Sequence, residues 1–324
     1  MKNISDIKDL LADDLNNTDK ALIKNLSSNV ALINTMSNYI ISAGGKRIRP
    51  MLLLLSARAT NYHGNKHHLM AVVIELIHTA TLLHDDIVDE SSTRRGLNTA
   101  NDVWGNASSV LVGDFLYSRA FEMMVDVDSM RIMQIMSKVT NSIAEGEVMQ
   151  LLNCKNSKLS EEDYFQVIER KTACLFQAST QIGSILSGSN KEHEEALRDY
   201  GMHLGNAFQI IDDVLDYGSD SEAIGKEVGD DLSEGKATLP MIYALHNTSG
   251  EEHKMLTDAI ENTGRNINID KIINVLTKTG ALKYSHSKAQ ESADLAIQSL
   301  NILPESDYKD ALILLCDISL KRNS

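Results

Sequence analysis

Two clusters of aspartates are the residues most able to do chemistry. They lie at Asp85–Asp89 and Asp212–Asp216, and each has the pattern DDxxD. On a helix, the first and last aspartate of a cluster share one face a turn apart, where their charges repel each other. A hard divalent cation would offset this repulsion, and Mg²⁺ takes one or two carboxylates and completes its shell with water and phosphate. Two such clusters facing across a cavity would hold magnesium around a diphosphate; for either cluster alone, a solvated acidic helix face is the alternative.

Basic residues accompany both clusters, as a diphosphate site requires. Residues 44–50, GGKRIRP, provide three cations after a glycine pair and just before an apolar run. Flexible glycines followed by a helix N-terminus favour anion binding. Arg94 and Arg95 follow the first cluster, and the planar fork of arginine suits phosphate oxygens. Each of the later cations, taken alone, is more typical of a surface charge: Lys171, Lys226 and Lys236.

The segments that carry these residues have the periodicity of helices. Within 71–89, apolar and functional residues recur at steps of three or four and share one face. Residues 110–125 are apolar on nearly every side, which is typical of a helix buried inside a bundle. Long helices are also expected over 161–185 and 192–217, while strand patterns are scarce. We therefore predict an all-α fold, with residues 1–324 forming one helical bundle around a central cavity.

The composition fits a soluble helical protein that binds small anions. Of 324 residues, 43% are hydrophobic, and 3 are prolines, so long helices and a large core are possible. The 45 acidic and 31 basic residues argue against nucleic acid as a partner. The 3 cysteines fit no metal motif. We see neither a signal peptide nor a transmembrane segment and expect a cytoplasmic protein.

Together these motifs resemble the trans-isoprenyl diphosphate synthases, also called polyprenyl synthases, and among them the long-chain members that make octaprenyl diphosphate. The resemblance runs over nearly the whole chain. Besides GGKRIRP and the pair Lys171-Thr172, it rests on the segments 77–96, 105–124, 144–151, 208–217 and 225–240. It implies a magnesium-dependent prenyltransferase that ionises an allylic diphosphate such as farnesyl diphosphate and adds isopentenyl diphosphate units. It also implies a homodimer, with quinone side chains as the usual use of the product.

The same resemblance implies roles for individual residues. About three Mg²⁺ ions per active site would be held by carboxylate oxygens, which come from Asp85, Asp86, Asp89, Asp212, Asp213 and Asp216. The allylic diphosphate would be contacted by Arg94, Lys171, Lys226 and Lys236. Isopentenyl diphosphate would be bound by Lys46, Arg49, His78 and Arg95. Thr172 and Gln209 would lie near the reacting carbons.

The length of the product depends on the space available to the growing hydrocarbon. If Asp85 holds the diphosphate, the chain should run along the helix face N-terminal to it. Ala80 and Thr81 are small and leave this path open, and each further turn lengthens it by about 5.4 Å. Ile77 and Ile74 would continue the wall. For the floor we expect Met124 and Met136, with Phe121 nearby, although ordinary core methionines explain the pattern equally well.

Four other functions share part of this pattern. A shorter-chain farnesyl or geranylgeranyl synthase would carry the same motifs. A terpene cyclase would share the first cluster but needs neither a second DDxxD nor a cationic pocket for isopentenyl diphosphate. The dipeptide His84-Asp85 also occurs in helical HD phosphohydrolases, which would leave the second cluster unexplained. A non-catalytic partner subunit would lack the aspartates.

Overall fold

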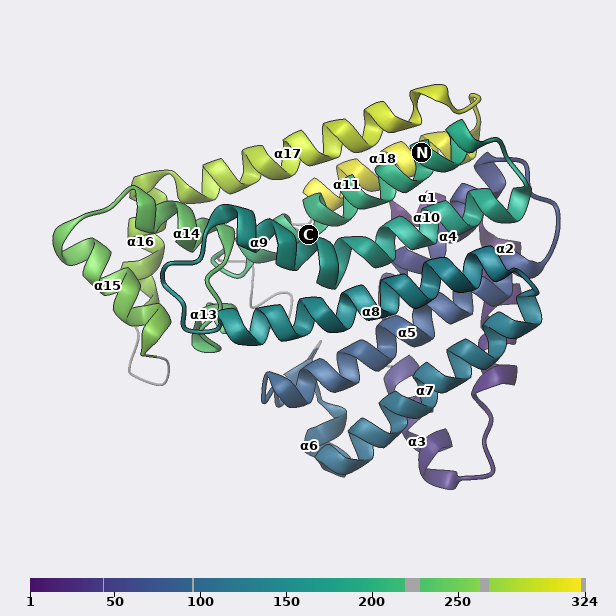
Figure 1. Cartoon of the computed structure of the whole chain (residues 1–324), viewed down its shortest axis with the longest axis horizontal. Coiled ribbons are helices and arrows are strands. Elements are labelled where there is room, and N and C mark those ends of the chain that lie inside the picture. The colour runs from purple at the N-terminus through teal and green to yellow at the C-terminus, as the bar shows by residue number, and fades with distance from the viewer. Residues whose placement is uncertain (43, 95, 219–227, 263–267, 322–324) are drawn as a thin grey trace. The chain divides into compact units, whose positions relative to one another are not determined.

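Helices dominate the chain, which confirms the predicted all-α class (Figure 1). The computed structural model describes residues 1–42, 44–94, 96–218, 228–262 and 268–321. Contacts within the chain group it into two compact units, which are described separately. The first comprises Met1–Thr140, Leu175–Gly201 and Ser299–Leu315, and the second Asn141–Cys174, Met202–Gln298 and Cys316–Ser324. A single domain over 1–324 stays a prediction.

The N-terminal part of the first unit packs around α5. Its elements are α1 (Ile4–Leu10), α2 (Ala12–Leu26), α3 (Ala31–Ser42), α4 (Ile48–Ala59), α5 (Lys66–Val88), β1 (Thr93–Arg94), β2 (Leu97–Asn98), α6 (Ala100–Trp104) and α7 (Asn106–Val127). Helix α5 has no glycine or proline to interrupt it, and it packs against α2, α4 and α7. Residues 51–55 of α4 are fully buried. The buried apolar residues of α4 and α5 therefore hold α5 in place within the first unit.

A short hairpin follows α5 and brings a basic residue back towards it. Strands β1 and β2 pair antiparallel, with Thr93 opposite Asn98 and Arg94 opposite Leu97. The amide of Thr99 donates to the carbonyl of Ser92, and its hydroxyl donates to that of Ser91. These bonds fix the turn in the chain directly after the first aspartate cluster.

The helix predicted over 110–125 is present as α7, but the prediction that it is buried inside the bundle is wrong for part of its surface. Leu111 and Val125 are each 67% exposed, and Val110 is also exposed. Gly113 and Met124, in contrast, are buried. The helices of a single chain therefore cover only part of this apolar surface, and sequence periodicity cannot show which part.

The remaining helices continue along the chain. They are α8 (Met130–Asn153), α9 (Glu161–Ile168), η1 (Glu169–Ala173), α10 (Cys174–Ser187), α11 (Lys191–Leu215), α13 (Asp230–Ser233), α14 (Leu239–His246), α15 (Gly250–Glu261), α16 (Ile269–Thr279), α17 (Ala281–Ser299), η2 (Leu300–Ile302) and α18 (Asp307–Leu320). Helices α14, α15 and α16 pack against one another in the second unit, around a core that includes Ile210, Met241, Leu256 and Leu276. The single helix predicted over 161–185 is interrupted by η1, a π-helical turn that widens the helix at Lys171 and Thr172.

Among the residues that the structure describes, none of the helices combines the length and the apolar character needed to cross a membrane.

Candidate functional site

The first aspartate cluster lies at the C-terminal end of α5. The Asp89 amide donates to the Asp85 carbonyl at 2.8 Å, so the helical turn continues to the end of the cluster. Asp85 and Asp89 therefore share a face as predicted, and both are partly exposed. A helix C-terminus carries partial negative charge, which adds to that of the carboxylates. This end of the helix consequently favours cations.

The middle aspartate of this cluster has different surroundings. Asp86 is 4% exposed, and its Oδ1 accepts a hydrogen bond from Arg94 Nε at 2.7 Å. Burial raises the pKa of the Asp86 carboxyl, and the neighbouring guanidinium of Arg94 partly offsets this. The sequence predicted both residues as ligands of substrate or metal. The structure shows that they also bind each other and thereby fix the hairpin to α5.

The predicted isopentenyl diphosphate residues come from two elements that the fold brings together. Arg47 directly precedes α4 and has a left-handed backbone conformation, so the chain of the basic segment changes direction at the helix N-terminus. Arg49 Nη1 lies 3.0 Å from His78 Nε2 on α5. The guanidinium of Arg49 also lies 4.6 Å from the centre of the Phe176 ring, within the range of a cation–π contact. Lys46 is exposed, and Arg95 lies outside the described residues.

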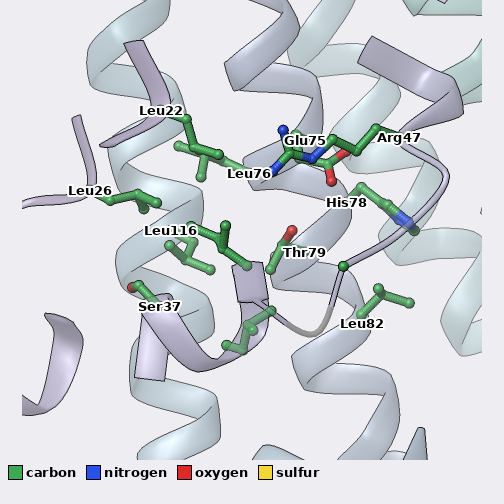
Figure 2. Close-up of a pocket in the computed structure, with 13 residues that line it drawn as sticks. Leu22, Leu26, Ser37, Arg47, Glu75, Leu76, His78, Thr79, Leu82 and Leu116 are labelled. Atoms are coloured by element: carbon green, nitrogen blue, oxygen red, sulfur yellow. The ribbon is translucent and has the colours of Figure 1, made fainter. Parts of the chain in front are cut away.

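A pocket lies next to this basic segment in the first unit (Figure 2). Leucines of α2 and α7 gather on one side of it, and Arg47 and His78 lie on the other. Helix α5 contributes the face that carries Glu75, Thr79 and Leu82. The pocket is therefore apolar at one end and charged at the other, where Arg47 lies beside Glu75 (Figure 2).

The predicted chain-length wall lies on a different part of α5. Ile74, Ile77 and Ala80 are fully buried, and none of them lines the pocket of Figure 2. Met124 and Met136 are buried as well. Thr81 is partly exposed, and its hydroxyl donates to the His78 carbonyl at 2.8 Å. A role of these residues in product length stays a prediction.

The second unit holds a chain of hydrogen bonds that links four side chains. The Thr172 hydroxyl donates to Gln209 Oε1 at 2.8 Å, and Gln209 Nε2 donates to Asp213 Oδ1 at 2.8 Å. The Tyr164 hydroxyl donates to the other oxygen of Asp213 at 2.6 Å. These contacts fix the orientation of the Gln209 amide. The structure thus brings together Thr172 and Gln209, which the sequence placed near the reacting carbons.

The three aspartates of the second cluster differ in exposure. Asp213 and Asp216 are each 3% exposed, whereas Asp212 is partly exposed. Burial raises the pKa of Asp213 well above its usual range, and the charge of Asp231 adds to this effect. Of this cluster, Asp212 is therefore the aspartate with the most accessible carboxylate. Asp85 and Asp212 belong to different units, so the predicted meeting of the two clusters stays a prediction.

The predicted diphosphate-binding lysines of the second unit are paired with acidic residues. Lys171 Nζ lies 2.7 Å from Glu147 Oε2, and Lys236 Nζ lies 2.5 Å from Glu234 Oε2. A Cβ atom added to Gly146 would lie 2.8 Å from the Lys171 amide nitrogen, so α8 can approach the π-helical turn closely only with glycine there. Lys226 lies outside the described residues.

Sequence reasoning assigned no role to Glu147 or Tyr164. Both contact predicted site residues, although they lie 24 and 49 positions from their partners, Lys171 and Asp213. Glu147 belongs to the segment 144–151, which carries part of the family resemblance. Its place in this segment is the feature of the sequence that could have identified Glu147 as a site residue.

A further group of side chains has the spacing of a metal site. Among the described residues, Asp14, His67 and His68 place ligand atoms within 4.8 Å of one another. However, Arg58 donates to both carboxylate oxygens of Asp14, at 2.8 and 2.6 Å. A metal-bound histidine normally donates its second ring nitrogen to an acceptor, and His67 Nδ1 is buried without a partner. The group is therefore better explained as an ion pair that joins α2, α4 and α5.

His84, which raised the possibility of a phosphohydrolase, lies against α7. Its Nε2 is 3.3 Å from the Val110 carbonyl oxygen and 3.5 Å from Asp114 Oδ1. A Cβ atom added to Gly113 would lie 2.3 Å from His84 Nε2, so the imidazole packs tightly on the backbone of α7. These contacts give His84 a role in packing α5 against α7.

Comparison with known proteins adds independent evidence. The polyprenyl synthetase family profile matches residues 30–276. The chain is 48% identical over 322 residues to octaprenyl diphosphate synthase of Escherichia coli (strain K12), covering 99% of each sequence. It is 46% identical over 318 residues to the geranyl-diphosphate-specific all-trans-nonaprenyl-diphosphate synthase of Rhodobacter capsulatus, covering 98% of this chain and 97% of that one.

A solved structure has the same fold over nearly the whole length of the chain. The polyprenyl synthase from Caulobacter crescentus CB15, complexed with calcium and isoprenyl diphosphate, has a TM-score of 0.95 and 38% identity, and the match covers 100% of this chain and 99% of that one. The family inferred from the sequence motifs is thus confirmed. The chain belongs to the polyprenyl synthetase family of prenyltransferases, the trans-prenyl diphosphate synthases.

Proposed function

We propose that this protein is a long-chain trans-polyprenyl diphosphate synthase that makes octaprenyl diphosphate. It adds isopentenyl diphosphate units to an allylic diphosphate such as farnesyl diphosphate. The observation that carries the proposal is the C-terminal end of α5, where the partly exposed Asp85 and Asp89 lie in the same unit as Arg94 and the Arg49–His78 pair. Identity of 48% to an octaprenyl diphosphate synthase over nearly the whole length supports the choice of product.

Magnesium fits the donor set of these motifs. Carboxylate oxygens are ligands that Mg²⁺ prefers, and Asp85, Asp89 and Asp212 keep partly exposed carboxylates. When bound, the metal stabilises the charge that develops on a diphosphate leaving group. We assign Asp86 and Asp213 to supporting positions, because both are buried and hydrogen-bonded to protein side chains. About three ions per active site remain our expectation.

Cationic side chains would bind the two substrates. Lys171 and Lys236, together with Arg94 and Lys226, would bind the allylic diphosphate and stabilise its charge as the carbon–oxygen bond breaks. Lys46, Arg49, His78 and Arg95 would hold isopentenyl diphosphate so that its double bond faces the allylic cation, which removes much of the entropic cost of the reaction. The released diphosphate is a suitable base for the final proton loss. These assignments extend the family roles to the matching residues.

The length of the product is set, in this proposal, by α5. Ala80 and Thr81 are small, so the path along the helix N-terminal to Asp85 would stay open to a growing chain. Ile77, Met124 and Met136 would line its deeper part. A bulky residue at position 80 or 81 would end the path within about one helical turn, or 5.4 Å, of the aspartates.

The exposed apolar side of α7 supports a homodimer. Val110, Leu111 and Val125 expose large hydrophobic side chains on one helix, and exposed apolar side chains that gather on one element are typical of an interface. We also propose a cytoplasmic enzyme whose product becomes the side chain of a ubiquinone or menaquinone.

Product analysis tests the proposed function. The purified protein is incubated with farnesyl diphosphate, radiolabelled isopentenyl diphosphate and Mg²⁺, and the dephosphorylated products are separated by length. We expect labelled octaprenol, and no product when the metal is removed with a chelator. Labelled products that stop at 20 carbons would identify a shorter-chain synthase. Unlabelled hydrocarbon without incorporation of isopentenyl diphosphate would identify a terpene cyclase.

A further inference from the structure

Gln150 lies between the two lysines of the second unit. It is on α8, one turn after Gly146, and its side chain is partly buried. With the amide oxygen directed towards the ammonium groups, this oxygen accepts a hydrogen bond from Lys171 Nζ and another from Lys236 Nζ, each at 3.2 Å. One neutral acceptor therefore joins two cations that lie 65 positions apart in the sequence.

Acidic residues complete the arrangement on either side. Glu147 binds Lys171 and Glu234 binds Lys236, so the charges alternate around the central amide. The side chains of these four residues are between 15% and 29% exposed, and each is thus accessible to solvent while held by the protein. An ammonium group has three donors, so a lysine can keep Gln150 while it binds a phosphate oxygen.

A neutral acceptor has a specific advantage at this position. Two ammonium groups this close repel each other, and Glu147 and Glu234 already balance their two charges. A carboxylate in place of the amide would therefore give the group a net negative charge, which disfavours a diphosphate. The amide carbonyl attracts both cations without adding a net charge. Lysine side chains are long and flexible, so a shared acceptor also lowers the entropic cost of ordering them when an anion binds.

We propose that Gln150 is a positioning residue that holds Lys171 and Lys236 as a pair for the two phosphates of an allylic diphosphate. The proposal deepens the proposed function, since it depends on these lysines binding the allylic diphosphate. Gln150 acts through the lysines and does not contact the reacting carbons.

Gln150→Leu tests the proposal, because leucine has a similar size but no acceptor. Gln134→Leu is the matched control, since Gln134 lies on the same helix with an exposed side chain. Binding of inorganic diphosphate with Mg²⁺ is measured by calorimetry, and KM is measured separately for farnesyl diphosphate and isopentenyl diphosphate. For Gln150→Leu we expect about tenfold weaker diphosphate binding and a similar rise in KM for farnesyl diphosphate, equivalent to about 1.4 kcal/mol. The KM of Gln150→Leu for isopentenyl diphosphate should stay within about twofold of the native value. All binding and kinetic constants of Gln134→Leu should do the same, because substitutions at sites without shared contacts act independently to about this degree.

A double-mutant cycle with Lys236→Ala shows whether Gln150 acts through the lysine. If it does, Gln150→Leu should weaken diphosphate binding much less in the Lys236→Ala background than in the native protein. An equal loss in both backgrounds, or unchanged binding in the single variant, would overturn the proposal. Calorimetry needs no turnover, so a wild-type protein that binds diphosphate but makes no prenyl product would refute the proposed function separately.

Discussion

Asp85 and Asp86 are neighbours in sequence but have opposite surroundings: Asp86 is buried, with its Oδ1 2.7 Å from Arg94 Nε, whereas Asp85 is partly exposed. The two residues look equivalent in the motif. The structure shows that Asp86 attaches the hairpin to α5, whereas the side chain of Asp85 stays partly exposed. Their substitution should therefore have different effects.

Asp85→Asn should remove most of the activity without weakening the fold. The carboxylate is a candidate metal ligand, and loss of such electrostatic stabilisation costs about 100-fold or more in kcat. The free energy of unfolding should stay within about 0.5 kcal/mol of the native value, because repulsion from Asp89 is relieved.

Asp86→Asn, in contrast, should destabilise the protein by about 1 kcal/mol, since Arg94 loses a charged partner but is itself partly exposed. Urea denaturation and turnover are measured for both; equal loss of stability would contradict the assignment.

Arg49→Lys should raise the KM for isopentenyl diphosphate by about tenfold or more, corresponding to about 1.4 kcal/mol or more of binding energy. Lysine keeps the charge but loses the planar fork that approaches His78 and stacks over Phe176. Arg47→Lys is the control, because Arg47 pairs with Asp19 instead and belongs to the same basic segment. Steady-state kinetics with each substrate varied in turn should show the change for isopentenyl diphosphate in Arg49→Lys alone. A similar rise in both variants would mean that only the total charge of the segment matters.

Tyr164→Phe should weaken both the fold and the reaction. The hydroxyl that donates to Asp213 at 2.6 Å is lost, which should cost about 1–3 kcal/mol in the free energy of unfolding. Because Asp213 also holds Gln209, we expect kcat to fall by about tenfold or more as well.

Tyr200→Phe provides the control for this experiment. Tyr200 is also fully buried, and its hydroxyl donates to the carbonyl of Leu312 at 2.7 Å in the first unit. This variant should lose stability without a comparable loss of kcat, as measured by thermal denaturation and turnover. If both variants lose kcat in proportion to stability, the hydrogen-bond chain has no specific role in the reaction.

Ala80→Phe should shorten the product while turnover continues. Phenylalanine would fill the space along α5 one turn before Asp85, and the wild-type residue is fully buried there. Ala80→Ser changes the volume little and should leave the product length unchanged. Chromatography of the dephosphorylated products measures the lengths, and equal distributions from the Ala80→Phe variant and the native protein would reject Ala80 as part of the wall. A thermal denaturation curve for each variant confirms that the added ring is accommodated.

Stability should fall as the pH drops below about 6.5 because of His67. Burial lowers the pKa of His67 below its usual value, although the hydrogen bond to Asp14 opposes this. The folded protein therefore binds fewer protons than the unfolded chain below about pH 6.5, so protonation favours unfolding. The stability that neutral His67 contributes is fully present above about pH 6.5 and is lost as the pH falls through the pKa of His67 in the folded protein. Urea midpoints at pH 5.5 and 7.5 should differ less in His67→Gln than in the native protein, and the exposed His63→Gln should retain the native difference.

The sequence alone determined the features that depend on local spacing. The helices that end in the two aspartate clusters, the shared face of Asp85 and Asp89, and the glycine pair before the basic segment all follow from intervals of a few residues. The motifs also identified the family, because they combine carboxylates and cations in a pattern that serves diphosphate chemistry.

Only the tertiary structure decided which of these residues are accessible and which hold one another. The contacts Arg49–His78, Glu147–Lys171 and Tyr164–Asp213 join residues on different helices, and the exposed side of α7 depends on which helices cover it. Local periodicity shows that a helix has an apolar or a charged face, but not what packs against that face. Burial and pairing are properties of the packed chain, and for that reason Asp85 and Asp86 could be distinguished only in the folded protein.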